Sequence, residues 1–310
     1  MGISNPCGGV IMADRKLSDI FIAPPISVLD VKQQYWKVRR NQWLNLKIES
    51  ELGREKNLLK LSTLLKKKQK ATSIFDPVLC EVIYRWFSAT NDMIFDPFAG
   101  GSVRGIVASK LQRNYVGIDL RKEQVAHNEI QAKTICNTHL PIWSCGSSAT
   151  SPIPECDLLF TCPPYYDLEK YSDDPQDLSN MNHADFDSLY ASIIARSMRG
   201  LRDNRFAVIV VGDVRGADGY YQHLPQKTVQ YFEDVGCRLY NDMVLLQEPA
   251  TAAMRAFNYM NASRKIAKAH QNVFVFVKGD AKIATERMQR FSDCETVDNS
   301  PFGMLTLEIF

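Results

Sequence analysis

The sequence has few of the features that mark membrane, secreted or metal-binding proteins. No window approaches the ~18 consecutive apolar residues of a membrane-spanning helix, and its first residues lack the basic-then-apolar layout of a secretory signal. The eight cysteines form no Cys-x-x-Cys pair and no Cys/His cluster at zinc spacing. We therefore expect reduced thiols, no bound metal, no membrane partner and a cytoplasmic location.

Net charge is also small, at +2 over 310 residues, but the charge is unevenly distributed. Twelve Lys or Arg and only three Glu lie between residues 32 and 70, and Tyr35, Trp36 and Trp43 stand among these cations. Aromatic side chains interleaved with cations suit stacking on bases and pairing with phosphates. An amphipathic helix with a solvated face would have the same composition. The sequence leaves both interpretations open.

From about residue 74, short apolar runs alternate with helical patterns. The runs at 93–95, 115–118, 157–160, 206–211, 239–246 and 273–277 are predicted strands. The segments 33–46, 49–65, 77–87, 103–111, 122–133, 186–201 and 228–235 have helical apolar spacing. This alternation predicts a doubly wound α/β sheet with mostly parallel strands.

An acid and two glycines follow the first predicted strand, in Asp96-Pro97-Phe98-Ala99-Gly100-Gly101-Ser102. Ligands bind at the carboxyl ends of strands in open α/β sheets, and glycine lets the backbone approach them closely. The turn has neither the dinucleotide fingerprint nor the Gly-Lys-Ser/Thr of a phosphate loop. Asp119 ends the next strand, near the spacing at which an acid meets ribose hydroxyls. An adenosine-bearing ligand with a positive amine would satisfy both acids, which points to S-adenosylmethionine.

A second unusual segment, Thr161-Cys162-Pro163-Pro164-Tyr165-Tyr166, ends the strand at 157–160. Each proline removes a backbone donor, so the loop leaves carbonyl oxygens available to the N–H groups of a ligand. The lone pair of an exocyclic base amine is delocalised into the ring. Oxygens that accept both hydrogens of the amine would localise this lone pair on nitrogen, and Tyr165 would stack on the base.

These motifs resemble those of the amino-directed (N6-adenine or N4-cytosine) DNA methyltransferases, most closely the phage and prophage type. The stretch from Phe95 to Ser102 resembles their cofactor motif, with Asp119 in the ribose position. The segment 72–77 resembles the part that contacts the methionine end of the cofactor, and Ser147 stands where the family often has an acid near the adenine ring. The loop 162–165 resembles the Asp/Asn/Ser-Pro-Pro-Tyr/Phe/Trp motif and departs from it at Cys162.

The resemblance implies an S-adenosylmethionine-dependent methyltransferase fold, Rossmann-like, with a mostly parallel seven-stranded sheet and an antiparallel last strand. It implies a site-specific enzyme that methylates a flipped base of double-stranded DNA, in the cytoplasm of a bacterium or a phage-infected host, as a monomer or homodimer. The expected parts are a mobile N-terminus (1–20), a basic helical arm (21–70), a catalytic domain (71–280) with a basic insertion at 247–272, and a C-terminal tail (281–310).

The residues expected to act follow from the same resemblance and from the two basic stretches. The catalytic residues are Cys162, Pro163, Pro164 and Tyr165. The cofactor-binding residues are Phe75, Asp76, Asp96, Pro97, Phe98, Gly100, Gly101, Ser102, Asp119, Leu120 and Ser147. The substrate-binding residues are Tyr166, Arg255, Arg264, Lys265 and Lys268, the last four because insertions often carry recognition.

Cys162 keeps other functions open, because sulfur is a weak hydrogen-bond acceptor. A cysteine-dependent cytosine-C5 methyltransferase would use the thiolate as a nucleophile, although in those enzymes proline precedes the cysteine. An RNA or protein-glutamine methyltransferase can share the proline motif. A DNA-binding module with a degenerate catalytic site is the non-enzymatic alternative.

Overall fold

The computed structural model describes residues 16–49, 75–166, 177–247, 250–288 and 290–291. The strands are β1 (Val28–Asp30), β2 (Met93–Asp96), β3 (Asn114–Asp119), β4 (Ile142–Cys145), β5 (Cys156–Thr161), β6 (Leu201–Val211), β7 (Arg238–Leu246) and β8 (His270–Lys278). The helices are α1 (Leu17–Phe21), α2 (Gln34–Leu44), α4 (Pro77–Phe87), α5 (Val103–Lys110), α6 (Lys122–Ile135), the short η1 (Leu178–Asn180), α7 (His183–Gly200), α8 (Leu224–Glu233), α9 (Ala250–Ser263) and α10 (Ala281–Glu286).

All eight strands join one sheet in the order β1-β7-β8-β6-β5-β2-β3-β4. Five neighbouring strands of this sheet, β4, β3, β2, β5 and β6, are parallel. When these five are numbered by their position in the chain, their order across the sheet is 3-2-1-4-5, which is that of doubly wound nucleotide-binding sheets. The last strand, β8, runs antiparallel to both β6 and β7. The predicted Rossmann-like α/β fold with an antiparallel last strand is therefore confirmed.

The expected number of seven strands is wrong, because β1 adds an eighth at the edge. β1 pairs in parallel with the end of β7, from Val28 opposite Val244 to Asp30 opposite Leu246. It has only three residues, of which one is buried, so it has too few positions to show an alternating pattern. The segment 21–29, the start of the predicted arm, supplies the end of α1 and the start of this strand.

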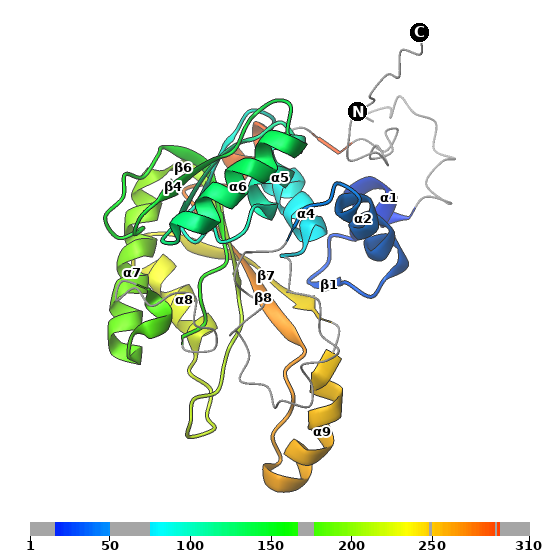
Figure 1. Cartoon of the computed structure of the whole chain (residues 1–310), viewed down its shortest axis with the longest axis vertical. Coiled ribbons are helices and arrows are strands. Elements are labelled where there is room, and N and C mark those ends of the chain that lie inside the picture. Colours follow the sequence, from blue (N-terminus) through cyan, green and yellow to red (C-terminus); the bar gives the residue numbers. More distant parts are fainter. Residues whose placement is uncertain (1–15, 50–74, 167–176, 248–249, 289, 292–310) are drawn as a thin grey trace, which may run out of the picture.

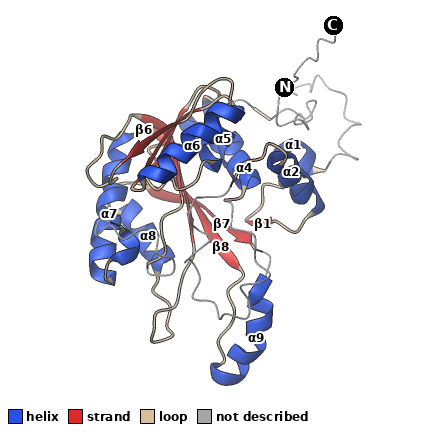
Figure 2. Ribbon diagram, viewed as in Figure 1, coloured by secondary structure: helices blue, strands red, loops and turns tan. Residues whose placement is uncertain are grey.

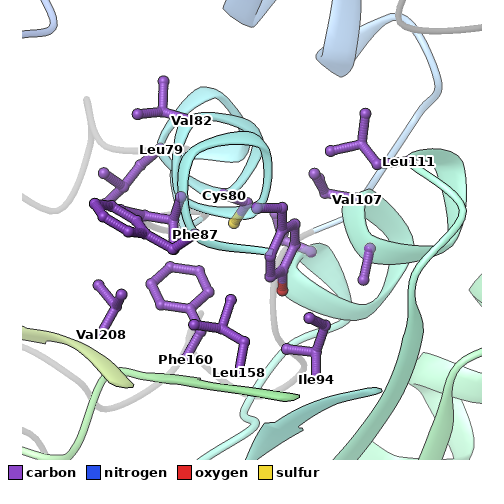
Figure 3. Packing of buried hydrophobic residues seen from close by; sticks show 14 of the residues in the cluster. Leu79, Cys80, Val82, Phe87, Ile94, Val107, Leu111, Leu158, Phe160 and Val208 are labelled. Carbon is purple, nitrogen blue, oxygen red and sulfur yellow. The ribbon is translucent and has the colours of Figure 1, made fainter. Parts of the chain in front are cut away.

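Helices cover both faces of the sheet (Figure 2), and successive residues of the central strands point to alternate faces. In β6, Phe206, Val208 and Val210 belong to the hydrophobic cluster under α4 and α5, whereas Ala207 and Ile209 belong to the cluster under α7 and α8. Figure 3 shows the first cluster, with side chains of α4 packed on those of β2, β5 and β6. Since both faces are buried, every residue of β5 is buried too.

The described part of the basic arm packs against α4. The indoles of Trp36 and Trp43 are 0% exposed, and their N–H groups donate to Asp76 Oδ2 (3.0 Å) and Glu81 Oε2 (2.8 Å). Arg39 Nε donates to Glu81 at 2.7 Å inside the same contact. Stacking of these two tryptophans on bases, one of the two open interpretations, is therefore wrong. The helix expected at 49–65 falls almost entirely outside the described residues.

No helix in the described part of the chain is long and apolar enough to cross a membrane. Among the same residues, no group of three or more His, Cys, Asp or Glu side chains could hold a metal ion.

Candidate functional site

A cavity of about 800 Å³ opens at the carboxyl ends of β2, β3, β5 and β6. This volume lies within the ~300–1,000 Å³ of small-molecule and cofactor sites. The cavity lies where the strand order reverses between β2 and β5, the position at which open α/β sheets bind ligands. Its wall includes thirteen of the predicted site residues: Phe75, Asp76, Pro97, Phe98, Gly100, Asp119, Leu120, Ser147, Cys162, Pro163, Pro164, Tyr165 and Lys268.

The glycine turn after β2 is held rigidly against the end of β3. Gly100 has a φ of 52°, in the left-handed region that favours glycine. Its N–H donates to Asp119 Oδ2 at 3.0 Å, and its carbonyl accepts from Asn128 Nδ2 at 2.8 Å. Asp119 Oδ1 accepts from the N–H of Arg121 at 2.8 Å. The backbone therefore fixes the Asp119 carboxylate in the cavity wall.

Asp96 lies beneath the turn and does not line the cavity. Its carboxylate is 0% exposed and accepts from Arg104 Nε (2.5 Å), Tyr115 OH (2.8 Å) and Thr161 Oγ1 (2.6 Å). Burial and the neighbouring Asp96 charge raise the pKa of Tyr115 well above its usual value of 10.0. Of the two acids expected to meet the ligand, only Asp119 is in place. Asp96 instead connects the glycine turn to Thr161, the residue before Cys162.

Gly101 and Ser102 were also predicted to bind the cofactor, but neither lines the described part of the cavity. The Ser102 side chain is 0% exposed and donates to Gln131 Oε1 at 3.2 Å. It therefore stabilises the start of α5 against α6.

The diproline loop follows β5, the neighbour of β2 in the sheet, and lines the same cavity. Cys162 Sγ lies 3.5 Å from Tyr165 OH, and Gln271 Nε2 donates to the same hydroxyl at 2.8 Å. A Cβ at Gly212 would lie 3.1 Å from Tyr165 Cε2, so the ring rests against the backbone after β6. The ends of β6 and β8 thus fix the Tyr165 ring in the cavity wall. Gln271 was missed in the sequence, because it belongs to no recognisable motif.

Tyr166 points away from the cavity, contrary to its predicted role in substrate binding. It is 1% exposed, and its hydroxyl donates to Asp187 Oδ1 at 2.7 Å and accepts from Lys227 Nζ at 3.0 Å. Burial and the Asp187 carboxylate raise its pKa. Its backbone has a φ of 51°. Tyr166 therefore anchors the end of the diproline loop to α7 and α8.

Phe75 and Asp76 line the far end of the cavity, where the arm meets the sheet. Asp76 caps α4 by accepting from the N–H of Val78 at 2.8 Å. Arg40, on α2, lies beside it, with Nε 4.0 Å from Asp76 Oδ2. The Arg40 Nε atom is buried, with no hydrogen-bond partner among the described residues. Sequence analysis counted Arg40 only as one of the cations of the basic arm, whereas the structure places it in the cavity wall.

Of the predicted basic contacts whose side chains the structure describes, only Lys268 lines the cavity. Burial lowers its pKa from the usual 10.5, and the Asp213 carboxylate acts in the opposite direction. Arg264 and Lys265 follow α9, outside the cavity wall. The side chain of Arg255 lies outside the described residues. Helix α9 projects from the sheet between β7 and β8 (Figure 1), so residues 250–269 of the predicted insertion form a protrusion, whereas 270–272 belong to β8.

The residues present fit S-adenosylmethionine. The left-handed turn at Gly100 lies beside a fixed carboxylate, Asp119, that can accept hydrogens from hydroxyl groups. At the other end, Arg40 and Asp76 offer a cation and an anion, and the Arg40 Nε donor is unsatisfied among the described residues. An amino-acid end carries one carboxylate and one ammonium group, so this pair matches it in charge.

Comparison with known proteins gives a family match over part of the chain. Residues 19–131 match the family model described as DNA methylase, whose name covers N6 and N4 methyltransferases. The match supports the expected family of amino-directed DNA methyltransferases, and with it S-adenosylmethionine as the cofactor. It contains the glycine turn and Asp119 and ends before the diproline loop. A search of curated proteins found no match.

Among solved structures, a proposed RNA methyltransferase from Pyrococcus horikoshii is 12% identical, with a TM-score of 0.49 over 79% of this chain and 100% of that chain. A methyltransferase from Pyrococcus furiosus is 11% identical, with a TM-score of 0.46 over 68% and 87%. The magnesium protoporphyrin IX methyltransferase of Synechocystis, solved with bound S-adenosylmethionine, is 9% identical, with a TM-score of 0.42 over 77% and 90%.

Proposed function

We propose that the protein methylates an exocyclic base amine, adenine N6 or cytosine N4, in double-stranded DNA, with S-adenosylmethionine as the methyl donor. One observation carries this proposal: the glycine turn and the diproline loop line the same cavity. Buried Asp96 bonds to Arg104 and Thr161 and so couples the two segments. The family match at residues 19–131 supports the DNA substrate.

The cofactor would lie along the cavity from β3 to the arm. Asp119 would accept hydrogens from ribose hydroxyls, and the apolar side chains of Phe98 and Leu120 would face the adenine ring. Arg40 and Asp76 would bind the carboxylate and the ammonium of the methionine end. When bound, S-adenosylmethionine supplies a methyl group on a positively charged sulfur, which a nucleophilic nitrogen can accept.

The chain's own contribution is to orient the target base and its amine. Tyr165, fixed by Gln271 and Gly212, presents a ring on which a flipped base can stack. The Pro163 carbonyl would accept one amine hydrogen, and the Cys162 sulfur would accept the other weakly. Fixed acceptors localise the nitrogen lone pair and hold it in line for transfer, which supplies much of the rate acceleration. The amine then gives up one proton to solvent.

The basic protrusion would hold the duplex at the cavity mouth. Lys268 lies in the cavity wall, and Arg264 and Lys265 lie close to it in sequence between α9 and β8. Lysine and arginine that neutralise phosphates release counterions, so binding should weaken as salt concentration rises. Arg255 lies on α9, and we propose that it contacts phosphates of the duplex as well.

The decisive experiment incubates the protein with tritiated S-adenosylmethionine and, in parallel, duplex DNA, transfer RNA and a protein mixture. Nucleoside analysis of the labelled product then identifies the modified base. We expect label in N6-methyladenine or N4-methylcytosine from DNA only. Asp119→Asn should lower transfer by weakening cofactor binding, whereas Asp203→Asn, an exposed control outside the cavity, should not. Label in RNA, in protein or in 5-methylcytosine would refute the proposal.

A further inference from the structure

A short hairpin follows β6 at the edge of the cavity, and the proposed function so far gives it no role. Asp213 and Val214 line the cavity, and the chain then turns back through residues 215–222. Arg215 and Tyr221 form an antiparallel bridge, and Gln222 N–H donates to the Val214 carbonyl at 3.0 Å. In Figure 1 the loop between β6 and α8 projects from the sheet in the same direction as α9.

Several contacts stiffen this hairpin. The N–H of Gly219 donates to the Gly216 carbonyl at 2.9 Å and closes the turn. Arg215 Nη1 donates to the Gly219 carbonyl at 3.0 Å, and its guanidinium lies 3.8 Å from the centre of the Tyr221 ring. The turn is therefore fixed before any ligand arrives, so little ordering entropy opposes binding there.

Tyr220, the first residue after the turn, is exposed on this stiff support. Its side chain is 75% exposed, the largest fraction among the exposed large hydrophobic side chains of the described residues. Its backbone N–H donates to Asp218 Oδ1 at 3.0 Å, which fixes its position on the turn. Nothing in the described fold packs a face of this ring into the core. A flat aromatic ring held out on a rigid turn is suited to stacking against another flat ring.

Positive charge surrounds the base of the hairpin. A side chain at Gly219 would overlap Lys265 Nζ, so this lysine touches the turn. Lys268 Nζ lies 5.8 Å from the centre of the Tyr221 ring. The acids of the hairpin, Asp213 and Asp218, each accept a backbone N–H bond within it. Lysines therefore lie beside Gly219 and Tyr221, the residues before and after Tyr220, where they could pair with the phosphates of a bound duplex.

We propose that Tyr220 enters the base stack of the bound duplex at the position that the target base vacates. This proposal rests on the proposed function and deepens it, because it assigns a residue to the extrusion step. A base that leaves the duplex loses its stacking and pairing energy. An inserted side chain restores part of the stacking and prevents the base from returning. Tyr165 thus stacks on the extruded base, and Tyr220 occupies the position in the duplex that this base has left.

The methylated site is first mapped by sequencing DNA from cells that express the wild-type protein. The test then measures methyl transfer to two oligonucleotide duplexes that carry this site. In one duplex the target base is paired, and in the other it faces an abasic position that removes the cost of unpairing. We expect Tyr220→Ala to lower kcat/KM on the paired duplex by about tenfold or more and to stay within about twofold of wild type on the abasic duplex. Tyr220→Trp should retain activity on both.

Tyr240→Ala is the matched control, since Tyr240 is 52% exposed but lies near the start of β7, away from the carboxyl end of the sheet. Calorimetric binding of S-adenosylhomocysteine verifies that each variant is folded. Wild-type rates for Tyr220→Ala on the paired duplex, or equal losses on both duplexes, would overturn the role of Tyr220 alone. Absence of transfer to any DNA by the wild-type protein would instead overturn the proposed function, and this inference with it.

Discussion

Cys162→Ser separates the proposed mechanism from a covalent one. The substitution replaces a weak acceptor by a strong one of nearly the same shape. Cys162 lines the cavity directly after buried strand β5, and its neighbours Thr161 and Pro163 are buried. The backbone position should therefore not change. A serine hydroxyl can also keep the contact with Tyr165 OH, which the sulfur makes at 3.5 Å.

The size of the effect follows from one improved hydrogen bond to the target amine. Such a bond contributes a net ~0.5–1.5 kcal/mol. Since ~1.4 kcal/mol corresponds to a factor of ten in rate, kcat/KM should rise about two- to twelvefold. A thiolate that must add to the base ring has no substitute in serine, so a covalent mechanism predicts loss of activity to background instead.

Initial rates of tritium transfer to duplex DNA measure this difference, with nucleoside analysis of the product. Cys145→Ser serves as the control, because Cys145 is an exposed thiol outside the cavity wall. Abolished transfer in Cys162→Ser, with unchanged binding of S-adenosylhomocysteine, would refute the direct mechanism.

Three further predictions follow from contacts around the cavity. Gln271→Leu removes the 2.8 Å bond to Tyr165 OH, so kcat should fall about two- to twelvefold while the Kd for S-adenosylhomocysteine stays unchanged; equal kcat would show that Tyr165 needs no such support. Arg40→Gln should raise that Kd, measured by calorimetry, and leave the melting temperature near wild type, because the Arg40 side chain is partly exposed; an unchanged Kd would remove Arg40 from the cofactor site. Burial raises the pKa of Glu81, but hydrogen bonds and charge from Arg39 and Arg85 outweigh it and lower the pKa below the usual 4.5. A lowered folded-state pKa stabilises the fold above pH 4.5 and ceases to do so as pH falls through the folded value. Urea unfolding measured between pH 7 and pH 3 should therefore show that the free energy of unfolding decreases once the pH is below about 4.5. Glu81→Gln leaves Arg39 buried without its charged partner, so this variant should be less stable than wild type by about 3–5 kcal/mol at neutral pH.

Much of the central fold could be predicted because its strands are buried on both faces. Continuous apolar runs such as 206–211 are typical of such strands, and the structure confirms strands at every predicted run. β1 and β4 carry weaker patterns. β1 has three residues, and in β4 only Trp143 is buried. Edge strands bury one face or less, so the sequence constrains them less.

The site was predictable where local geometry requires a rare residue combination. The glycine turn and the diproline loop are contiguous, and the structure brings Gly100, Asp119 and Cys162 to one cavity. Partners that come from distant segments were not predictable. Gln271 lies 106 residues from Tyr165 in sequence, and Arg40 reaches the cavity only because α2 packs on α4.

Asp96 shows a different limit of sequence reasoning. An acid at the end of a strand can face the ligand or lie under the turn, and the sequence pattern is the same in the two cases. Arg104, eight residues further on, reaches back from α5 to pair with it. The sequence contains this arginine but gives no sign that its side chain points inward rather than to solvent.

The position of β8 between β6 and β7 has a consequence for synthesis on the ribosome. The chain emerges from its N-terminus, so β6 and β7 are both complete before their shared neighbour exists. Until residue 278 has left the exit tunnel, each of these strands has an unpaired edge, and such edges invite pairing with other nascent chains. Tyr165 also lacks its Gln271 partner throughout this interval. The open strand edges therefore need either rapid synthesis of the remaining chain or a chaperone that covers them. Only after β8 has joined the sheet can Tyr165 take its place in the cavity wall.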